Sequence, residues 1–283
     1  MTLRVLLADA ASRLRDAGVP DARHDAEALL CHAGGFSRES LFLNNNLPPD
    51  GQLAERYASY VGRRMRGEPL QYITGEAWFY GRRFAVGPGV LIPRPETETL
   101  AAAALSIADG GACRSALDLC TGSGALAVTL AAERPGLSVT ATDISAEALA
   151  YARRNAEAHG AQARITFLEG DLFAALGSRP GAAFDLIASN PPYVRSGDLA
   201  SLQREIREHE PAIALDGGAG GLAFYERIAG QAARYLNPRG ALLLEIGADQ
   251  GEGVRGILES RGFKGIQILH DLSEKPRVAR AFL

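Results

Sequence analysis

Residues 115–124 have the sequence SALDLCTGSG, which predicts the end of a buried strand followed by a tight turn. The run Ser115–Leu119 suits a strand, and the apolar stretch Ala125–Glu133 suits a helix. Gly122 and Gly124 would let a ligand approach the backbone of this turn closely, and the start of the helix offers free N–H groups. Because the third glycine of the dinucleotide fingerprint is missing, the turn alone fits either a ligand site or a turn that binds nothing.

Strands and helices alternate after this turn, as in a parallel sheet covered by helices. We expect strands at residues 115–119, 138–142, 165–169, 184–189 and 241–246, and helices at 125–133, 146–159 and 222–235. Two further strand-like runs, 266–269 and 278–283, are joined by a short polar loop, so one edge should carry an antiparallel strand. The sequence therefore predicts an α/β fold with a seven-stranded, mostly parallel sheet.

The N-terminal part of the chain has a different pattern. Apolar residues recur at helix spacing up to about residue 70, which predicts a small helical domain over 1–70. Residues 71–93 contain many strand-favouring side chains, including Tyr72, Ile73 and Thr74, and predict a connecting β-hairpin. We expect the α/β domain to occupy 94–283 and to begin with a helix at about 96–108.

Composition and charge exclude several classes of function. The 283 residues carry a net charge of -3, whereas proteins that grip many phosphates are usually basic, so we do not expect a nucleic-acid partner. No apolar run approaches the ~20 residues that span a bilayer. Three cysteines, Cys31, Cys113 and Cys120, lack the spacing of a metal site or of a C-x-x-C pair, which favours a reducing compartment. We expect a cytoplasmic protein without a metal or a membrane contact.

Acidic residues follow the next two predicted strands. Asp143 lies about 20 residues after Gly122, where a carboxylate can accept hydrogen bonds from both ribose hydroxyls, although it also suits a helix cap. Asp171 can accept a hydrogen bond from an adenine amino group and Leu172 can pack on the ring, although a turn beside a core leucine has the same pattern. Together the loops predict a nucleoside-containing cofactor, and they do not separate NAD from S-adenosylmethionine.

Residues 190–193, with the sequence NPPY, end the fourth predicted strand. Two prolines also stop strands that have no role in binding. However, an apolar strand that ends in Asn-Pro-Pro-Tyr beside a cofactor crevice is a far more specific signal. It favours transfer of a methyl group from S-adenosylmethionine to a planar amide or amino nitrogen.

The residue types in this segment suit that chemistry. An amide nitrogen is a poor nucleophile because its lone pair is delocalised, and two acceptors aimed at its N–H bonds would stabilise the charge that develops during attack. The side-chain oxygen of Asn190 and the carbonyl of Pro191 can be these acceptors. Pro191 and Pro192 stiffen the backbone, and Tyr193 can lie flat against the amide. We therefore predict that all four residues bind substrate and that Asn190, Pro191 and Tyr193 are catalytic.

With these residues in view, the chain resembles the release-factor glutamine methyltransferases, the PrmC/HemK family, over nearly its whole length. The similarity rests on GEPLQYITG at 67–75, LIPRPETE at 91–98, residues 118–124, Asp143, residues 190–193, and the run from Glu210-Pro211 to ALDGG at 214–218. The second of these motifs combined with NPPY is much more specific than either motif alone.

The resemblance implies a class I, Rossmann-like methyltransferase domain that uses S-adenosyl-L-methionine and releases S-adenosyl-L-homocysteine. The implied substrate is the N5 atom of glutamine in the Gly-Gly-Gln tripeptide of bacterial class I peptide chain release factors, which links the chain to translation termination. The N-terminal helical domain is implied to help hold the factor. We expect the enzyme to be a monomer.

The resemblance also assigns residues by position. The family's cofactor contacts match Cys120, Thr121, Gly122, Ser123, Gly124, Asp143, Leu172 and Asn190, and its glutamine-binding segment matches Asn190, Pro191, Pro192 and Tyr193. Cys120 stands where glycine is expected in many relatives, and a small thiol should be tolerated there if the backbone takes an ordinary φ.

Two other functions remain open from the sequence. An N-methyltransferase that acts on an exocyclic amino group of an RNA or DNA base would need the same two acceptors and the same aromatic ring. A protein that binds an adenosyl ligand without catalysis would need only the cofactor loops. Arg94, between two prolines, fits either a solvated charge or a contact for an acidic protein partner.

Overall fold

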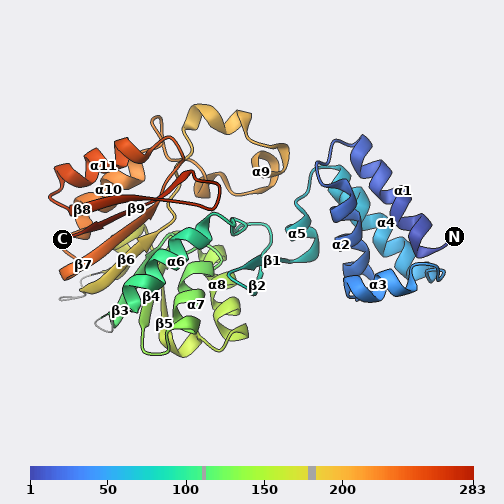
Figure 1. The fold of residues 1–283 in the computed structure, drawn as a ribbon, viewed down its shortest axis with the longest axis horizontal. Helices are drawn as coiled ribbons and strands as arrows, with labels where there is room; N and C mark the ends of the chain where they lie inside the picture. Colours follow the sequence, from blue (N-terminus) through green and yellow to red (C-terminus); the bar gives the residue numbers. More distant parts are fainter. Residues whose placement is uncertain (110–112, 178–182) are drawn as a thin grey trace. The chain divides into compact units, whose positions relative to one another are not determined.

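The computed structural model describes residues 1–109, 113–177 and 183–283, and its contacts divide the chain into two compact units (Figure 1). Unit 1 consists of Met1–Glu76 and Gln203–His209, and unit 2 consists of Ala77–Leu202 and Glu210–Leu283. The division expected from sequence, 1–70, 71–93 and 94–283, stays a prediction.

Unit 1 is helical. Its helices are α1 (Leu3–Asp16), α2 (Ala22–Gly34), α3 (Arg38–Asn44), α4 (Gly51–Met65), α5 (Leu70–Thr74) and α9 (Arg204–His209). The hydroxyl of Ser37 and the carboxylate of Asp50 accept backbone N–H groups at the starts of α3 and α4, as N-caps do. Apolar side chains spaced by three and four residues fill a common core.

The strand expected at Tyr72, Ile73 and Thr74 is wrong, because these residues form α5. Pro69 fixes the backbone before the helix, and Gly75 ends it with a φ of 76°. Ile73 is buried in the core of unit 1, so tertiary packing overrides the strand propensity of these side chains. The hairpin itself is present and consists of β1 (Glu76–Phe79) and β2 (Arg82–Ala85).

Unit 2 contains a seven-stranded sheet with the strand order β5-β4-β3-β6-β7-β9-β8. Its strands are β3 (Ser115–Leu119), β4 (Ser138–Asp143), β5 (Ile165–Glu169), β6 (Phe184–Ser189), β7 (Leu236–Glu245), β8 (Lys264–His270) and β9 (Pro276–Phe282). Strands β3 to β7 pair in parallel, and β9 is antiparallel to both of its neighbours. The predicted mostly parallel sheet with an antiparallel edge is confirmed.

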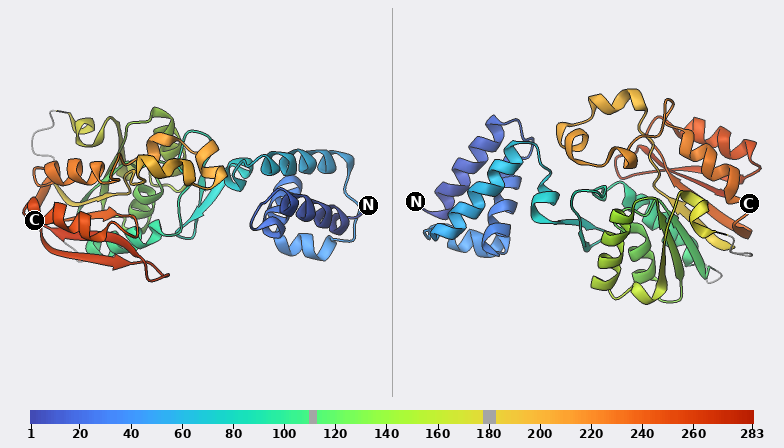
Figure 2. Two further views of the ribbon diagram at one scale, coloured as in Figure 1. Left: turned by 90° about the horizontal axis from the view of Figure 1, so that it is seen from above. Right: turned by 180° about the vertical axis from the view of Figure 1, so that it is seen from behind.

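Helices cover both faces of this sheet (Figure 2). The longer ones are α6 (Thr97–Ala108), α7 (Ala125–Glu133), α8 (Ala146–Ala158), α10 (Ala223–Ala232) and α11 (Gly251–Ser260). Neighbouring strand residues point to opposite faces, so Leu186 packs in one core with α6 and α7, and Ile187 packs in the other with α10 and α11. Because both faces are buried, the central strands β3 and β6 are mostly apolar.

A buried side chain of α8 ties the hairpin to the turn after β3. The amide of Asn155 donates to the carbonyls of Ala85 and Ser123 and accepts from the N–H of Ala85, at 2.7–3.0 Å. The strand register brings the carboxyl ends of β3, β4, β5, β6 and β7 to one edge of the sheet. Ligands of open α/β sheets bind at this edge.

Within the described parts of the chain, no helix combines the length and the apolar character that a bilayer crossing demands.

Candidate active site

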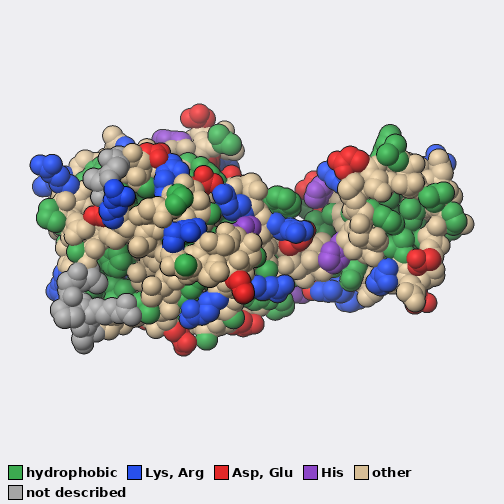
Figure 3. All heavy atoms as spheres, turned by 90° about the horizontal axis from the view of Figure 1, so that it is seen from below, with side chains coloured by type: hydrophobic (Ala, Val, Ile, Leu, Met, Phe, Trp, Pro, Cys, Tyr) green, Lys and Arg blue, Asp and Glu red, His purple; other side chains and the backbone are tan. Residues whose placement is uncertain are grey.

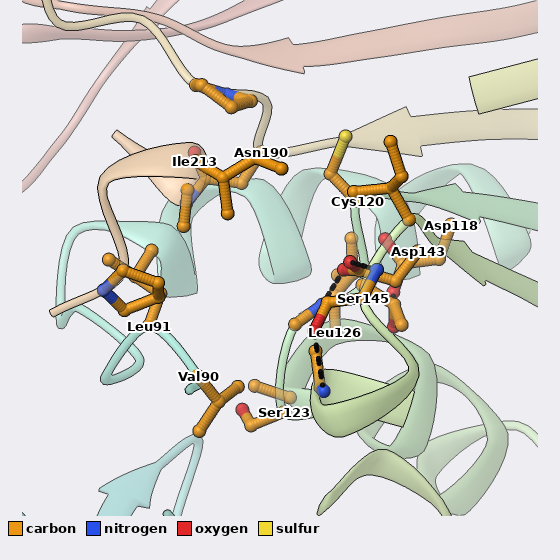
Figure 4. A pocket seen from close by; sticks show the side chains of 18 of the residues that line it. Val90, Leu91, Asp118, Cys120, Ser123, Leu126, Asp143, Ser145, Asn190 and Ile213 are labelled. Atoms are coloured by element: carbon orange, nitrogen blue, oxygen red, sulfur yellow. Dashed lines mark hydrogen bonds between the residues drawn. The ribbon is translucent and has the colours of Figure 1, made fainter. Parts of the chain in front are cut away.

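A pocket lies at the carboxyl ends of these strands, within unit 2 (Figure 4). The loops after β3, β4 and β5, the segment after β6, and residues 89–97 and 211–214 contribute to its lining. The lining includes nine residues predicted from sequence: Cys120, Thr121, Gly122, Ser123, Asp143, Asp171, Leu172, Asn190 and Pro192. Gly124, Pro191 and Tyr193 are absent from the lining among the described residues.

The turn after β3 is organised by Asp118. Its buried carboxylate accepts from the hydroxyl of Thr121 at 2.6 Å and from the N–H of Ala127 at 3.2 Å, which joins the turn to the first residues of α7. Burial raises the pKa of Asp118 to about 7. Gly124 has a φ of 79°, and a Cβ there would lie 3.0 Å from Ala152 on α8, so glycine is needed for both backbone and packing.

The backbone of Cys120 differs from the sequence expectation. Its φ is 59°, in the left-handed region, so the condition of an ordinary φ is not met. A residue with a Cβ costs about 1 kcal/mol in this conformation, which explains why glycine suits the position. Burial raises the pKa of the Cys120 thiol, which disfavours the reactive thiolate.

The carboxylate of Asp143 has room for a further ligand. One oxygen accepts from the N–H of Gly122 at 2.8 Å and the other from the N–H of Ser145 at 2.9 Å. A carboxylate has about four acceptor positions, so two remain for the hydroxyls of a ribose. Burial raises the pKa of Asp143. The residues present therefore fit a nucleoside.

The turn after β5 holds its side chains in a defined arrangement. Leu172 is buried with a φ of 50°, and the carboxylate of Asp171 accepts from Arg227 at 2.6 Å. The guanidinium of Arg227 also lies over the ring of Phe224 at 5.3 Å from its centre. One oxygen of Asp171 is thus paired, and the other is the candidate acceptor for an adenine amino group.

Asn190 is held at the pocket through its amide nitrogen, which donates to the hydroxyl of Thr97 at 3.2 Å. The segment that follows Asn190 is braced by hydrogen bonds from behind. Val194 exchanges backbone hydrogen bonds with Leu215 and Gly217 at 2.9 and 2.8 Å, and the side chain of Gln250 donates to the carbonyl of Tyr193 at 2.9 Å. The backbone at residues 190–194 is therefore fixed on both sides.

The side chain of Tyr193 packs into the core of unit 2 and is not among the described residues that line the pocket. Its hydroxyl donates to the carboxyl of Glu245 at 3.5 Å, and its ring packs against the core formed with α10 and α11. Burial raises the pKa of Tyr193 to about 12. The stacking of Tyr193 on a substrate amide therefore stays a prediction.

Sequence reasoning missed several residues of this site. The sequence motif that contains Thr97 does not indicate a contact with Asn190, and Glu245 and Gln250 belong to no motif, although Glu245 ends a strand as Asp143 does. The sequence leaves Arg94 open between a solvated charge and a contact for an acidic protein partner, and the structure adds that it lines the pocket and pairs with the buried Glu210 at 2.5 Å. Among the described residues, no cluster of His, Cys, Asp and Glu is arranged to hold a metal ion.

Comparisons with known proteins agree with this geometry. Residues 6–75 match the family model described as PrmC N-terminal domain, and residues 100–261 match the one described as methyltransferase small domain. The release factor glutamine methyltransferase of Geobacter sulfurreducens is 44% identical over 93% of this chain and 90% of its own length. That of Cereibacter sphaeroides is 43% identical over 97% of this chain and 96% of its own.

A solved structure shares the fold. The 16S rRNA N2 G1207 methyltransferase of T. thermophilus, determined with AdoMet and guanosine, superposes with a TM-score of 0.52 and is 23% identical, covering 73% of this chain and 49% of its own. At this level of identity the likeness shows the fold alone.

Proposed function

The chain belongs to the release factor glutamine methyltransferases, and on that premise we propose that it methylates the N5 atom of the glutamine in the Gly-Gly-Gln motif of class I peptide chain release factors. The methyl donor we propose is S-adenosyl-L-methionine, which supplies an electrophilic methyl group when bound. Asp143 would hold its ribose, and Asp171 and Leu172 its adenine.

One observation carries the proposal: the Asn190 amide nitrogen is occupied by Thr97. The side-chain oxygen of Asn190 is therefore the end left to accept a hydrogen bond from a substrate amide. We propose that this oxygen and the carbonyl of Pro191 take the two N–H groups of the glutamine. Both contacts strengthen as the nitrogen becomes positive, which lowers the barrier to attack.

We propose that unit 1 helps to hold the release factor. Figure 3 shows hydrophobic side chains at the surface of this unit on the face drawn. Independently of that view, Val5, Phe42, Leu43 and Leu47 are exposed. Exposed apolar side chains on a protein of this size suit a protein partner. We also propose that the enzyme acts in the cytoplasm as a monomer, and size-exclusion chromatography with light scattering tests the second point.

The function can be tested with a labelled methyl donor. The enzyme is incubated with this donor and a release factor and, separately, with the donor and total RNA. We expect label in the factor, located on the glutamine of the tripeptide by tandem mass spectrometry. Label in RNA alone would instead support an enzyme that acts on a base, and donor binding without transfer would support a non-catalytic protein.

The variant Asn190→Ala tests the role of the amide oxygen in the same assay. We expect turnover to fall by roughly 10²-fold or more, while binding of the methyl donor, measured by calorimetry, is retained. Near-normal turnover would remove Asn190 from the chemistry.

A further inference from the structure

The side-chain amide of Gln250 lies where the segment after β6 meets the loops that precede α10 and α11, all within unit 2. Its nitrogen donates to the carbonyls of Tyr193 and Gly221, at 2.9 and 3.2 Å. Its oxygen accepts from the N–H of Gly247 at 2.9 Å and from the hydroxyl of Tyr225 at 3.1 Å. Gln250 is 4% exposed. A glutamine amide has two N–H groups and two lone pairs, so this buried amide has a partner at every position.

The helix that follows does not explain the side chain of Gln250. This residue precedes α11, a position where serine, threonine, aspartate and asparagine are preferred because their short side chains accept from the first N–H groups of a helix. The side chain of Gln250 makes no such bond. Its surroundings instead leave room for the amide, since a Cβ at Gly221 would lie 2.6 Å from the amide nitrogen and a Cβ at Gly247 would lie 2.9 Å from the oxygen. The side chain therefore holds the segments around it and not the helix.

The Asn-Pro-Pro-Tyr segment at 190–193 depends on donors from outside it. Pro191 and Pro192 have no backbone N–H, so the middle of the segment cannot donate to a neighbour. The carbonyl of Tyr193 accepts from Gln250. Because each proline ring fixes φ at about -65°, the backbone between Pro191 and Tyr193 is stiff. The position of the Tyr193 carbonyl therefore helps to determine where the Pro191 carbonyl lies.

We propose that Gln250 is a positioning residue for methyl transfer, whose amide holds the carbonyl of Tyr193 and thereby aims the carbonyl of Pro191 at the substrate amide. The inference rests on the proposed function, since that function gives the Pro191 carbonyl its task. Gln250 is not among the described residues that line the pocket, so it acts only through the segment. Loss of its amide would let the segment shift, and a displacement of about 1 Å in a positioning group lowers the rate strongly.

Gln250→Met tests the amide, because methionine has a similar length and offers no N–H group to Tyr193. We expect kcat for release-factor methylation to fall roughly tenfold or more. The Kd of the methyl donor, measured by calorimetry, should stay within about twofold of the wild type, because the cofactor loops do not depend on this contact. A kcat within about twofold of the wild type would overturn the proposal.

Tyr225→Phe is the matched control at the oxygen end of the same amide. The single hydrogen of the Tyr225 hydroxyl is shared between the oxygen of Gln250 at 3.1 Å and the carbonyl of Glu245 at 3.0 Å. Without it, the oxygen of Gln250 keeps the N–H of Gly247, and the nitrogen keeps Tyr193. We expect kcat within about threefold of the wild type. A loss equal to that of Gln250→Met would overturn the assignment of the effect to the contact with Tyr193.

Leu258→Ala separates positioning from stability. Leu258 is fully buried on α11 and is not among the described residues that line the pocket. The substitution leaves a cavity and so lowers the stability of unit 2 without removing a hydrogen bond of Gln250. At a temperature where both variants are folded, kcat should be unaltered in Leu258→Ala. A fall in kcat equal to that of Gln250→Met would show that general destabilisation, and not positioning, is the cause.

Hydrogen exchange tests the contact without any substrate. The N–H groups of Val194 and Gly217 donate to the carbonyls of Leu215 and Val194 at 2.9 and 2.8 Å, next to the carbonyl that Gln250 holds. In Gln250→Met these two amides should exchange roughly tenfold faster or more, relative to amides of β3, which report on global opening. Unchanged exchange would refute the positioning role even if the enzyme methylates release factors. Conversely, a wild type that does not methylate release factors would overturn the proposed function, while the exchange result would still decide whether Gln250 holds the segment.

Discussion

Single residues determine the conformation of the cofactor loops. At the position proposed for the ribose, Asp143 has the largest part in this. Each of its oxygens already accepts one backbone N–H, from Gly122 and from Ser145. The same carboxylate thus shapes the loop and offers the remaining acceptor positions to a ligand. A carboxylate in this double role is best tested by its effect on ligand affinity.

Asp143→Ala should weaken binding of the methyl donor roughly tenfold or more, since hydrogen bonds to a charged group are worth about 1.5–3 kcal/mol. Calorimetric titration measures this directly. Asp249→Ala, which removes an exposed carboxylate outside the pocket lining, is the control and should bind normally. Unchanged affinity in Asp143→Ala would contradict the ribose assignment.

Asp118 should make stability fall as the pH rises. Its folded-state pKa of about 7 lies above the ordinary 3.8, so the folded state holds an extra proton between these values and loses stability as that proton leaves. Asp118→Asn cannot titrate. Its free energy of unfolding relative to the wild type should therefore increase from about pH 4 to pH 7, by at most a few kcal/mol, in urea titrations. A constant difference would show that Asp118 keeps its ordinary pKa.

The residues predicted from sequence were those that follow a strand within one continuous motif. Cys120, Asp143, Leu172 and Asn190 line the pocket because parallel strands end at one edge. Thr97 and Glu245 escaped prediction because their partners are distant in sequence, and only the strand order brings them together. The left-handed φ of Cys120 could not be predicted either, because nothing in a cysteine side chain indicates this conformation.

At the scale of elements, close backbone packing holds the Asn-Pro-Pro-Tyr segment. Residues 215–218 run behind it, and a Cβ at Gly217 would lie 2.7 Å from the Cα of Tyr193. That distance is shorter than real contacts allow, so the segment or its neighbour would have to move. Gly217 therefore lets two segments far apart in sequence meet.

Gly217→Ala should lower kcat for methyl transfer at least tenfold, because a shift of about 1 Å in a positioning segment has large effects on rate. It should also lower the free energy of unfolding by about 1–3 kcal/mol, as overpacking does. At Gly220 an added Cβ meets no described atom within 4 Å, so Gly220→Ala is the control in both kinetic and unfolding measurements. Equal behaviour of the two variants would count against close packing as the cause.

Most elements were predictable because their periodicity is strong. The strands Ser115–Leu119, Ile165–Glu169 and Phe184–Ser189 and the helix Ala125–Glu133 have the predicted bounds. The failure at α5 came from strand-favouring side chains whose burial in unit 1 outweighs their propensity.

At the scale of the whole chain, unit 1 is not continuous in sequence. The chain leaves unit 2 after Leu202, contributes α9 to unit 1 and returns at Glu210. Within unit 1, the buried guanidinium of Arg64 donates to Asp25 at 2.7 Å and pairs with Glu205 of α9 at 2.5 Å. Local sequence patterns gave no sign of this arrangement, because α9 lies over 130 residues beyond α4 in the chain.

Arg64→Ala should lower the thermal stability of unit 1, since it removes the buried partner of the Asp25 carboxylate and leaves only the exposed His24 beside it, at a cost of up to about 3–5 kcal/mol. Scanning calorimetry should show unit 1 unfolding at a lower temperature. Arg66→Ala, the loss of an exposed arginine near the same helix end, is the control. The affinity for the methyl donor should be unchanged in both variants, because the pocket belongs to unit 2. A loss of donor affinity that accompanies the loss of stability in Arg64→Ala would contradict the independence of the pocket from unit 1.

The most direct measurement is a crystal structure with S-adenosyl-L-homocysteine and a Gly-Gly-Gln peptide bound. We expect the glutamine nitrogen about 3 Å from both the side-chain oxygen of Asn190 and the carbonyl of Pro191, with the cofactor sulfur in line behind it. An Asn190 amide turned away from the peptide, with the glutamine bound elsewhere, would contradict the proposed chemistry.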